Sequence, residues 1–419
     1  MNNTMSKSKR NFVVILISVM VGLIFFVPYI RFSFYDQFVA AFGLTNLELG
    51  NIGSVYGLIS LFCYPVGGIL ADRFSSRVML AVSFGACSVL TFWEASFPAY
   101  SSLLVISALF AIFNAGTMWA PYIKLLRSLG TESEQGKLFG TSEALRGIAS
   151  AVVGFVFLAL LGYFADQVAG IRMVLISFGV IYAVFAVLSI LFLPRTEKTV
   201  KTEAAVEGDG NKSILTHIIT VLKLPGTWLL SFFMFSCYCV IITGVNYLGT
   251  YSTQILGISP ELSSGIALFR NYVVVVVAGI LGGILADKAK SKLMFIIYLL
   301  AAITVCAGIM PFISQAVMVS VVVSVVIAYL YYSVKSVYFS VMGEGGIPLE
   351  LTGIAAGIIS FITFSPDAFI TTLMGSWLDA DPVQGFNMIF IWMAIWSVVA
   401  IVFAYIINKR SVKNQKIKE

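Results

Sequence analysis

The sequence predicts an all-α integral membrane protein with about twelve transmembrane helices in two pseudo-symmetric halves of six. Of its 419 residues, 59% are hydrophobic and only 11% are charged, whereas soluble domains carry roughly 25% charged residues. The apolar residues form about twelve runs near the length of about 20 residues that crosses a hydrocarbon core. The segment GGILADRFSSR, which begins at Gly67, returns largely unchanged as GGILADKAKSK at Gly282. A repeat at equivalent points of two halves indicates an internal duplication.

In the first half, short polar segments separate the apolar runs. Lys7, Lys9 and Arg10 precede the first run, and by the positive-inside rule they place the N-terminus in the cytoplasm. The sequence Gly-Leu-Thr-Asn before the second run signals a turn and a helix start. The predicted spans are about 11–34, 49–71, 78–93, 103–126, a fifth that opens with TSEALRG after the predicted loop TESEQGKLFG, and 172–193.

The composition then changes at a central polar stretch, PRTEKTVKTEAAVEGDGNKS, which predicts a flexible linker. The following ILTHIITVLKL predicts a short amphipathic helix at the cytoplasmic surface. We therefore expect an N-terminal half at 1–193, a cytoplasmic linker at 194–225, and a C-terminal half with a basic tail at 226–419. The spans predicted for this second half are about 228–247, 261–286, 293–312, 317–341, 352–377 and 386–407. The even number places both termini in the cytoplasm.

Several functional classes are not expected. The net charge of +6 lies in short loops rather than on one soluble face, so nucleic acid is not an expected partner. No group of nucleophile, base and orienting residue appears, so we expect neither an enzyme nor a bound cofactor. All five cysteines fall inside apolar runs, which argues against disulfides and a metal site. They are Cys63, Cys87, Cys237, Cys239 and Cys306.

The duplicated segment carries a family resemblance. Between the second and third spans it reads Gly67, Asp72, Arg73 and Arg77, spaced as Gly-x-x-x-x-Asp-Arg-x-x-x-Arg. This pattern resembles the cytoplasmic loop signature of the major facilitator superfamily. A weaker second copy consists of Gly282, Asp287, Lys288 and Lys292. The resemblance implies the major facilitator fold and transport by alternating access, in which Asp72, Arg73 and Arg77 latch the cytoplasmic gate and Asp287 and Lys288 form a looser partner.

Four cations fall within predicted spans, namely Arg31, Arg146, Arg270 and Lys335. Each costs roughly 2.5–3.5 kcal/mol at the centre of a bilayer, so such residues usually face a cavity or a partner. Arg31 and Arg270 belong to opposite halves, as an anion site between the halves would require, and guanidinium groups hold carboxylate or phosphate bidentately. For Arg31 the alternative is an interfacial side chain that snorkels outward, paired with Asp36.

Other polar residues in the spans complete the predicted site. Asp367 is the candidate for proton coupling, because a buried carboxylate beside an arginine can bind and release a proton. A structural ion pair between Arg270 and Asp367 is the alternative. Glu143 and Arg146 are three residues apart on one helix face and are expected to form a gating pair. The residues expected to line the substrate site are Trp119, Asn246, Tyr247 and Lys335.

Three stretches further resemble the organophosphate:inorganic phosphate antiporters and a related group of bacterial transporters. They are RFSFYDQFVAAFGLTNLELGNIGSVYG with Arg31, the fifth-helix stretch with Glu143 and Arg146, and TGIAAGIISFITFSPDAFITTLMGSWLD. The resemblance places Arg31 where those carriers have one of two phosphate-clamping arginines. Their second clamping arginine lies in helix seven, where this chain has only neutral residues such as Thr243 and Asn246. Phosphate-for-phosphate exchange is therefore not predicted.

We therefore predict a monomeric, multi-pass transporter of the bacterial inner membrane. It would move a small organic anion, such as a carboxylate, sugar acid or phosphorylated metabolite, and a proton is the expected co-substrate. The alternative is a proton-coupled exporter of amphipathic or drug-like compounds, in which the cations act as gates and the aromatic residues bind the cargo.

Overall fold

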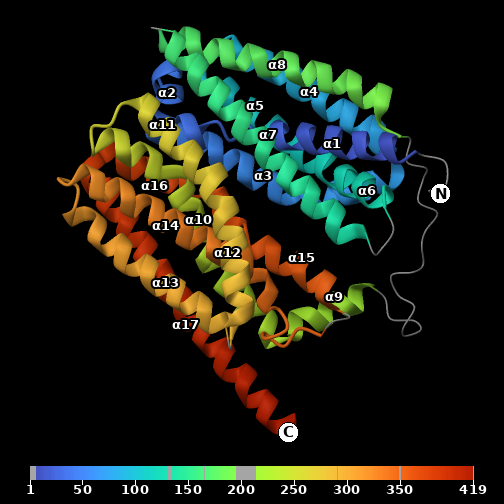
Figure 1. Cartoon of the computed structure of the whole chain (residues 1–419), viewed down its shortest axis with the longest axis vertical. Coiled ribbons are helices and arrows are strands. Elements are labelled where there is room, and N and C mark those ends of the chain that lie inside the picture. The colour runs from blue at the N-terminus through green and yellow to red at the C-terminus, as the bar shows by residue number, and fades with distance from the viewer. Residues whose placement is uncertain are drawn as a thin grey trace. The chain divides into compact units, whose positions relative to one another are not determined.

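The computed structural model describes residues 6–130, 134–164, 166–194, 214–289, 291–348 and 351–418. Within these ranges the protein is helical and contains no β-strand (Figure 1). Its internal contacts divide it into two compact units, Met1–Thr202 with Pro260–Leu268, and Glu203–Ser259 with Phe269–Glu419. The predicted linker lies largely in residues 195–213, outside the described residues.

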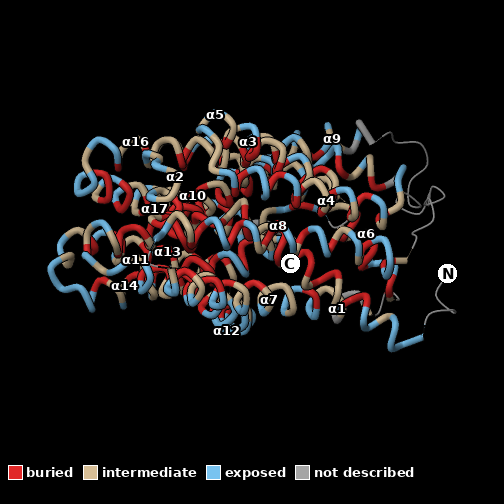
Figure 2. Tube along the Cα trace, turned by 90° about the horizontal axis from the view of Figure 1, so that it is seen from above, coloured by how far each residue is buried: buried red, intermediate tan, exposed pale blue. Residues whose placement is uncertain are grey.

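In its described residues, the first unit contains nine α-helices and one π-helical segment. These are α1 Lys7–Ile24, α2 Arg31–Phe42, α3 Asn46–Arg73, α4 Ser76–Ala95, α5 Tyr100–Ala111, η1 Ile112–Trp119, α6 Ala120–Ser128, α7 Gln135–Tyr163, α8 Gln167–Phe192 and α11 Pro260–Leu268. Helix α4 packs along α8, α1 packs along α7, and α3 packs against η1. In Figure 2 the buried residues gather where helices face one another. The rings of Phe26 and Phe178 stack at 4.8 Å in this core.

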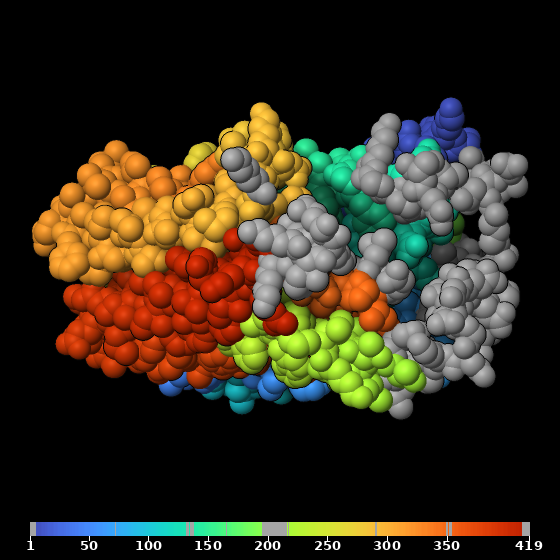
Figure 3. Space-filling view, turned by 90° about the horizontal axis from the view of Figure 1, so that it is seen from below, coloured from blue at the N-terminus to red at the C-terminus, as the bar shows by residue number. Residues whose placement is uncertain are grey.

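The second unit contains the remaining helices. These are α9 Ile214–Lys223, α10 Pro225–Gln254, η3 Phe269–Val274, α12 Val275–Lys288, α13 Lys292–Ile309, η4 Met310–Phe312, α14 Val317–Val337, η5 Tyr338–Val341, α15 Thr352–Thr363, η7 Ser365–Ala368, α16 Ile370–Ala380 and α17 Pro382–Lys418. Helix α17 packs along α13 and α10, and Figure 3 shows its red surface beside the orange surface of α13. Helix α9 confirms the predicted short helix after the linker.

The first predicted span, 11–34, is not one continuous helix. Helix α1 ends at Ile24, and α2 begins at Arg31. Pro28 has no N–H group to donate to the carbonyl of Ile24 four residues earlier, which removes one helical hydrogen bond at the point where the helix breaks. The hydroxyl of Tyr182 on α8 donates to the carbonyls of Leu23 and Ile24 at 2.9 and 3.1 Å. This bond satisfies the free end of α1.

The predicted span 352–377 is also broken. Helix α15 ends at Thr363, and the 3₁₀ turn Ser365–Ala368 separates it from α16. Pro366 cannot donate to the carbonyl of Ile362, and the hydroxyl of Ser365 donates to that carbonyl at 2.8 Å instead. The break places Asp367 in a turn between two half-helices rather than in the middle of a helix.

Eleven helical segments of the described chain are long and apolar enough to cross a membrane. Helix α1 is not among them, because its 18 residues include Lys7, Lys9 and Arg10. Together with the apolar segment formed by α1 and α2, the eleven agree with the predicted number of about twelve. The expected loop TESEQGKLFG is shorter than predicted, since α7 already begins at Gln135.

Candidate functional site

Arg31 is buried at the start of α2, with 6% of its surface exposed. Its Nη1 donates to the carbonyl of Pro28 at 2.7 Å, which the break after α1 leaves without a helical donor. Its guanidinium carbon lies 4.9 Å from the ring centroid of Phe32 and 5.6 Å from that of Tyr29, within the range of cation–π attraction. This burial argues against the outward-snorkelling alternative.

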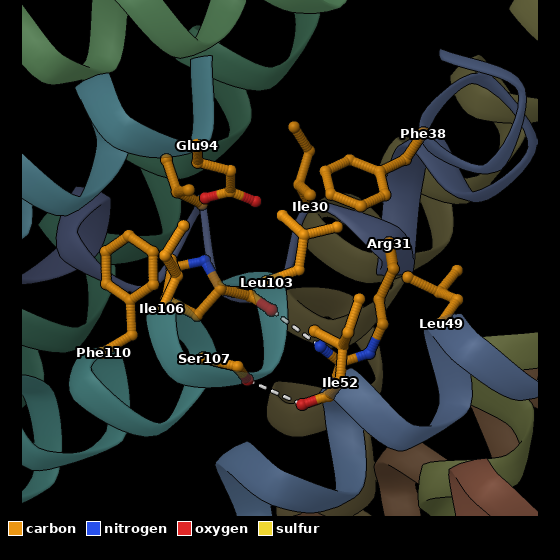
Figure 4. A pocket seen from close by; sticks show the side chains of 12 residues that line it. Ile30, Arg31, Phe38, Leu49, Ile52, Glu94, Leu103, Ile106, Ser107 and Phe110 are labelled. Carbon is orange, nitrogen blue, oxygen red and sulfur yellow. Dashed lines mark hydrogen bonds between the residues drawn. The ribbon is translucent and has the colours of Figure 1, made fainter. Parts of the chain in front are cut away.

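Arg31 lines a small cavity in the first unit (Figure 4). The other walls are apolar side chains of the segment between α1 and α2 and of α2, α3 and α5, together with Ser107 and the carboxyl group of Glu94. The hydroxyl of Ser107 donates to the carbonyl of Ile52 at 2.6 Å. The cavity, which we call the Arg31 cavity, has a volume of about 20 Å³, enough for about one water molecule.

Glu94 is a site candidate that our sequence reasoning missed. The third span was predicted to end at Trp93, but α4 continues to Ala95 and carries Glu94 inside the helix. Only 7% of this residue is exposed, and its Oε2 has no hydrogen-bond partner among the described residues. An acidic residue directly after an apolar run was the available signal.

Arg270 is the corresponding buried cation of the second unit. It lies in the π-helical segment η3 and is 2% exposed. Its Nη1 donates to the hydroxyl of Ser324 on α14 at 3.1 Å. The phenols of Tyr331 and Tyr332 are close enough to interact with its charge. No carboxylate forms an ion pair with Arg270 in the part of the chain that the structure describes, so the considered pair with Asp367 is not formed.

The wide turns of the two π-helical segments carry polar residues of both units. Such turns are uncommon and often occur at functional sites. In η1, Asn114 accepts a bond from the thiol of Cys87 at 3.2 Å. In η3, Asn271 follows Arg270 and accepts a bond from the hydroxyl of Tyr332 at 3.0 Å. Arg270 and Asn271 therefore both contact α14.

The other expected lining residues of the second unit differ in their surroundings. Asn246 is 2% exposed; its Nδ2 donates to the carbonyl of Ile242 at 2.8 Å, and its Oδ1 has no partner among the described residues. Tyr247 is also buried and donates to the carbonyl of Thr371 at 3.0 Å. Lys335 is exposed on α14.

The carboxylate of Asp367 is paired with a tyrosine that the sequence did not suggest. The hydroxyl of Tyr238 on α10 lies 3.0 Å from Oδ1 and 2.9 Å from Oδ2 of Asp367. Asp367 is half-buried in the turn between α15 and α16. Because α10 and η7 are in contact, the break at Pro366 brings the carboxylate onto the face of α10.

The predicted gating pair of Glu143 and Arg146 does form an ion pair on α7. The guanidinium carbon of Arg146 lies 5.3 Å from the ring centroid of Trp119 and 5.8 Å from that of Tyr122. Trp119 is thus a partner of Arg146 within the first unit. Whether these residues act in gating stays a prediction.

The two copies of the repeated segment differ in their ion pairs. In the second copy, Asp287 forms an ion pair at 3.0 Å with Lys292, which is farther along the sequence than Lys288. Lys288 itself is exposed. In the first copy, Arg73 is exposed at the end of α3 and Arg77 is half-buried on α4. Asp72 is in the last turn of α3, and its side chain lies outside the described residues.

The first glycine of each Gly-Gly pair lies at a close helix contact. A Cβ on Gly67 would lie 2.6 Å from the carbonyl oxygen of Gly116, and one on Gly282 would lie 3.0 Å from Cβ of Ser333. The second glycines, Gly68 and Gly283, have no such neighbour within 4 Å. The repeat therefore preserves one helix contact in each unit, as expected for small residues at membrane helix interfaces.

Metal-binding geometry is not apparent in the described residues. No group of three or more His, Cys, Asp and Glu side chains among them is placed to hold a metal ion. The chemistry that these polar groups offer is the binding of charge, through the buried guanidinium groups of Arg31 and Arg270, the buried carboxyl group of Glu94 and the half-buried carboxyl group of Asp367.

A bundle of membrane-spanning helices with buried ionisable residues and a duplicated Gly-Gly contact defines a polytopic membrane protein of the transporter class. The chain belongs to the Major Facilitator Superfamily, since the model of that family matches residues 11–371. Family membership supports secondary transport as its general activity and identifies the fold as a transporter fold rather than that of an enzyme.

Individual relatives agree with this assignment. The inner membrane protein YqcE of Escherichia coli is 27% identical over 400 residues, which cover 93% of this chain and 92% of the relative. The nitrite extrusion protein of Bacillus subtilis is 26% identical over 67% of this chain and 66% of its own length. The crystal structure of a bacterial homologue of the human lysosomal transporter Spinster has the same fold, with a TM-score of 0.76, 14% identity and coverage of 98% and 99%.

Proposed function

We propose that this transporter moves a small organic anion, such as a carboxylate, sugar acid or phosphorylated metabolite, by alternating access and together with a proton. Arg31 of the first unit and Arg270 of the second are the proposed anion-binding residues. Asn246, Tyr247, Trp119 and Lys335 are proposed as neighbouring substrate contacts. Asp367 is a proposed proton carrier.

The observation that carries this proposal is the environment of Arg270. This guanidinium group is 2% exposed, and its hydrogen-bond partner is a serine hydroxyl. In the described chain it has no carboxylate as counter-ion. A cation buried in this way is costly. An anionic substrate would supply the missing charge. The buried Oδ1 of Asn246, on α10 of the same unit, is a further polar atom that a substrate donor can satisfy.

One relative points in the same direction. The nitrite extrusion protein of Bacillus subtilis is named for an inorganic anion. Because this relative is 26% identical over two thirds of the chain, it supports the charge of the cargo rather than its identity.

We further propose a monomer in the bacterial inner membrane with both termini in the cytoplasm. In this arrangement the halves at 1–193 and 226–419 are the two moving parts, joined by the linker at 194–225. Asp72, Arg73 and Arg77, together with Asp287 and Lys288, would hold the cytoplasmic gate, and the pair of Glu143 and Arg146 would add a second contact that opens and closes.

Ligand-dependent thermal stabilisation of the purified protein tests this function, because a ligand of the folded state raises its stability by mass action. The panel consists of pyruvate, gluconate, glucose 6-phosphate and the lipophilic cation tetraphenylphosphonium. Wild-type protein is compared with Arg31→Ala, Arg270→Ala and the control Arg410→Ala, at an exposed arginine on α17 that has no part in the proposed site or gate. We expect one class of anion to raise the unfolding temperature of the wild type and of the control. The same anion should leave the unfolding temperatures of Arg31→Ala and Arg270→Ala unchanged.

The exporter alternative gives the opposite pattern. Stabilisation by tetraphenylphosphonium alone, retained in Arg31→Ala and Arg270→Ala, would contradict anion transport and favour the export of amphipathic compounds.

A further inference from the structure

The second ionisable group of the Arg31 cavity is the carboxyl group of Glu94. It lies within a membrane-spanning segment, Ser76–Ala95, and is 7% exposed. An ionised carboxylate in such a place needs a donor or a counter-charge, yet its Oε2 has no hydrogen-bond partner among the described residues. Figure 4 shows Glu94 and Arg31 on different sides of the same cavity. The cavity therefore holds one cationic and one acidic group.

The size of the cavity limits what can join these two groups. A volume of about 20 Å³ accommodates about one water molecule and is far too small for an organic anion. One water molecule can accept from the guanidinium group and donate to the carboxylate. In this arrangement of the helices the cavity therefore admits no organic substrate between Arg31 and Glu94.

Few other ionisable groups face Glu94. From α8, the phenol of Tyr182 interacts with its charge, and this phenol is already bound to the carbonyls that end α1. Of the two charged residues of α2, Arg31 lines the cavity and Asp36 does not. The cavity walls from α3 and α5 are Leu49, Ile52, Leu103, Ile106, Ser107 and Phe110, none of which titrates. Among the described residues, Arg31 is therefore the cation that lines this cavity together with Glu94.

We propose that Glu94 binds the transported proton and that its carboxylate competes with the anionic substrate for Arg31. This inference rests on the proposed function, in which Arg31 binds the anion. When no anion is bound, the Glu94 carboxylate balances the charge of Arg31. When the helices separate and an anion binds Arg31, Glu94 loses its counter-charge and takes up one proton.

The consequence is that anion and proton bind together. The loaded first unit then contains a guanidinium–anion pair and a neutral carboxylic acid, so the binding of one anion with one proton adds no net charge to this region. A membrane protein gains from this balance, because an unpaired charge is costly in the bilayer. Glu94 is thus a proton site in addition to the proposed Asp367 of the second unit.

Linkage between anion and proton binding tests the assignment in the full-length protein. Affinities for pyruvate and gluconate, which both stay ionised above pH 5, are measured by thermal stabilisation from pH 5.5 to 8. Proton uptake on mixing is read with an indicator dye in weak buffer. For glucose 6-phosphate, which itself titrates in this range, proton uptake is compared between variant and wild type. The variants are Glu94→Gln and Glu48→Gln.

Glu48→Gln is the matched control. Glu48 lies at the first turn of α3 and closes a capping box with Thr45, which glutamine can also complete. We expect the wild type and the control to bind the anion up to about tenfold more weakly per unit rise in pH, and to take up about one proton per anion. In Glu94→Gln, anion binding persists, but the contribution of Glu94 to its pH dependence and proton uptake is lost, which leaves at most the contribution of the proposed carrier Asp367.

The possible results separate the two proposals. Anion binding with the same pH dependence in Glu94→Gln and in the wild type overturns the role of Glu94 and leaves anion transport intact. Absence of anion binding in the wild type overturns the proposed function and the linkage together.

A second measurement does not depend on a variant that folds. Dicyclohexylcarbodiimide reacts with protonated carboxyl groups in apolar surroundings, and peptide mass spectrometry locates the modified residue. At pH 7.5 we expect modification of Glu94 in the wild type to increase severalfold when the binding anion is added. Modification that is absent or unchanged by the anion contradicts the proposal.

Discussion

The hydroxyl of Tyr238 lies within hydrogen-bond distance of both carboxylate oxygens of Asp367, at 3.0 and 2.9 Å. The two residues are 129 positions apart and belong to α10 and to the turn between α15 and α16. Their bond joins the break in the eleventh predicted span to the most buried helix of the second unit.

Removal of this hydroxyl is expected to destabilise the protein. Tyr238→Phe should cost about 1–3 kcal/mol, since a hydrogen bond to a charged group is lost. Thermal unfolding of Tyr238→Phe, Asp367→Asn and the double variant gives a double-mutant cycle. We expect the cost of Tyr238→Phe to be smaller when Asp367 is already asparagine. Strictly additive costs would show that the pair makes no specific contribution.

Ser324 is expected to orient the guanidinium group of Arg270 for anion binding. Ser324→Ala removes the 3.1 Å bond to Nη1 but keeps the charge, so the affinity for the stabilising anion should fall about 3- to 10-fold. The control is Ser320→Ala one turn away on α14, since Ser320 is equally buried and donates to the carbonyl of Ile313 at 2.7 Å. Equal losses of anion affinity in the two variants would contradict the orienting role.

The two glycines of the repeated segment should respond differently to a methyl group. Gly67→Ala places a Cβ 2.6 Å from the carbonyl oxygen of Gly116, and the resulting overpacking should cost about 1–3 kcal/mol of stability. Gly68→Ala meets no neighbour within 4 Å and should be neutral or gain up to about 1 kcal/mol from helix propensity. Thermal unfolding of the two variants in the same detergent measures the difference.

The second copy provides an independent repeat of this comparison. Gly282→Ala approaches Cβ of Ser333 at 3.0 Å, whereas Gly283→Ala meets nothing within 4 Å. We expect Gly282→Ala to be less stable than Gly283→Ala, with a smaller difference than between Gly67→Ala and Gly68→Ala, because the contact at Gly282 is looser than the contact at Gly67. A lower unfolding temperature for Gly283→Ala than for Gly282→Ala would contradict it.

Glu344 is expected to make stability decrease with rising pH. It lies in the loop after η5, outside the membrane-spanning segments. Burial raises its pKa above the ordinary value of 4.5, and Lys292 and hydrogen bonds from Ser291 and the Leu293 N–H only partly offset this effect. The folded state therefore holds the proton to higher pH than the unfolded state, so stability falls as pH rises from about 4.5 through the raised pKa.

The test is the unfolding temperature between pH 4.5 and 8. Glu344→Gln should show a shallower decline than the wild type over this range, since the group no longer titrates. Glu261→Gln, at an exposed acid in the first turn of α11, should keep the wild-type slope. A slope for Glu344→Gln as steep as that of the wild type would rule out this residue as the cause.

The helix breaks show where the sequence is informative and where it is not. Three of the prolines inside the predicted spans illustrate this. Pro65 sits inside the continuous helix α3, whereas Pro28 and Pro366 coincide with breaks. Every proline removes one backbone donor, but the outcome depends on what satisfies the freed carbonyl. Tyr182, 158 residues from Ile24, supplies one of these bonds, and no local pattern predicts such a partner.

The sequence by itself determined the class of the protein, its duplication and the approximate positions of its spans. A bilayer requires about 20 apolar residues per helix and internal satisfaction of the backbone, and these requirements are local and visible in composition. It also identified Arg31, Arg270 and Asp367 as unusual, because charge within an apolar run is itself a local signal.

Only the tertiary structure decided which groups these residues meet. Arg270 meets Ser324 rather than Asp367, Asp367 meets Tyr238, and Arg31 shares a cavity with Glu94. Each partner lies on another helix. Arg270 and Ser324 are 54 positions apart in the sequence, and Asp367 and Tyr238 are 129 positions apart. Such contacts depend on how each helix is rotated and broken against its neighbours, because side chains three or four residues apart on one helix face are the longest contacts that spacing alone can predict.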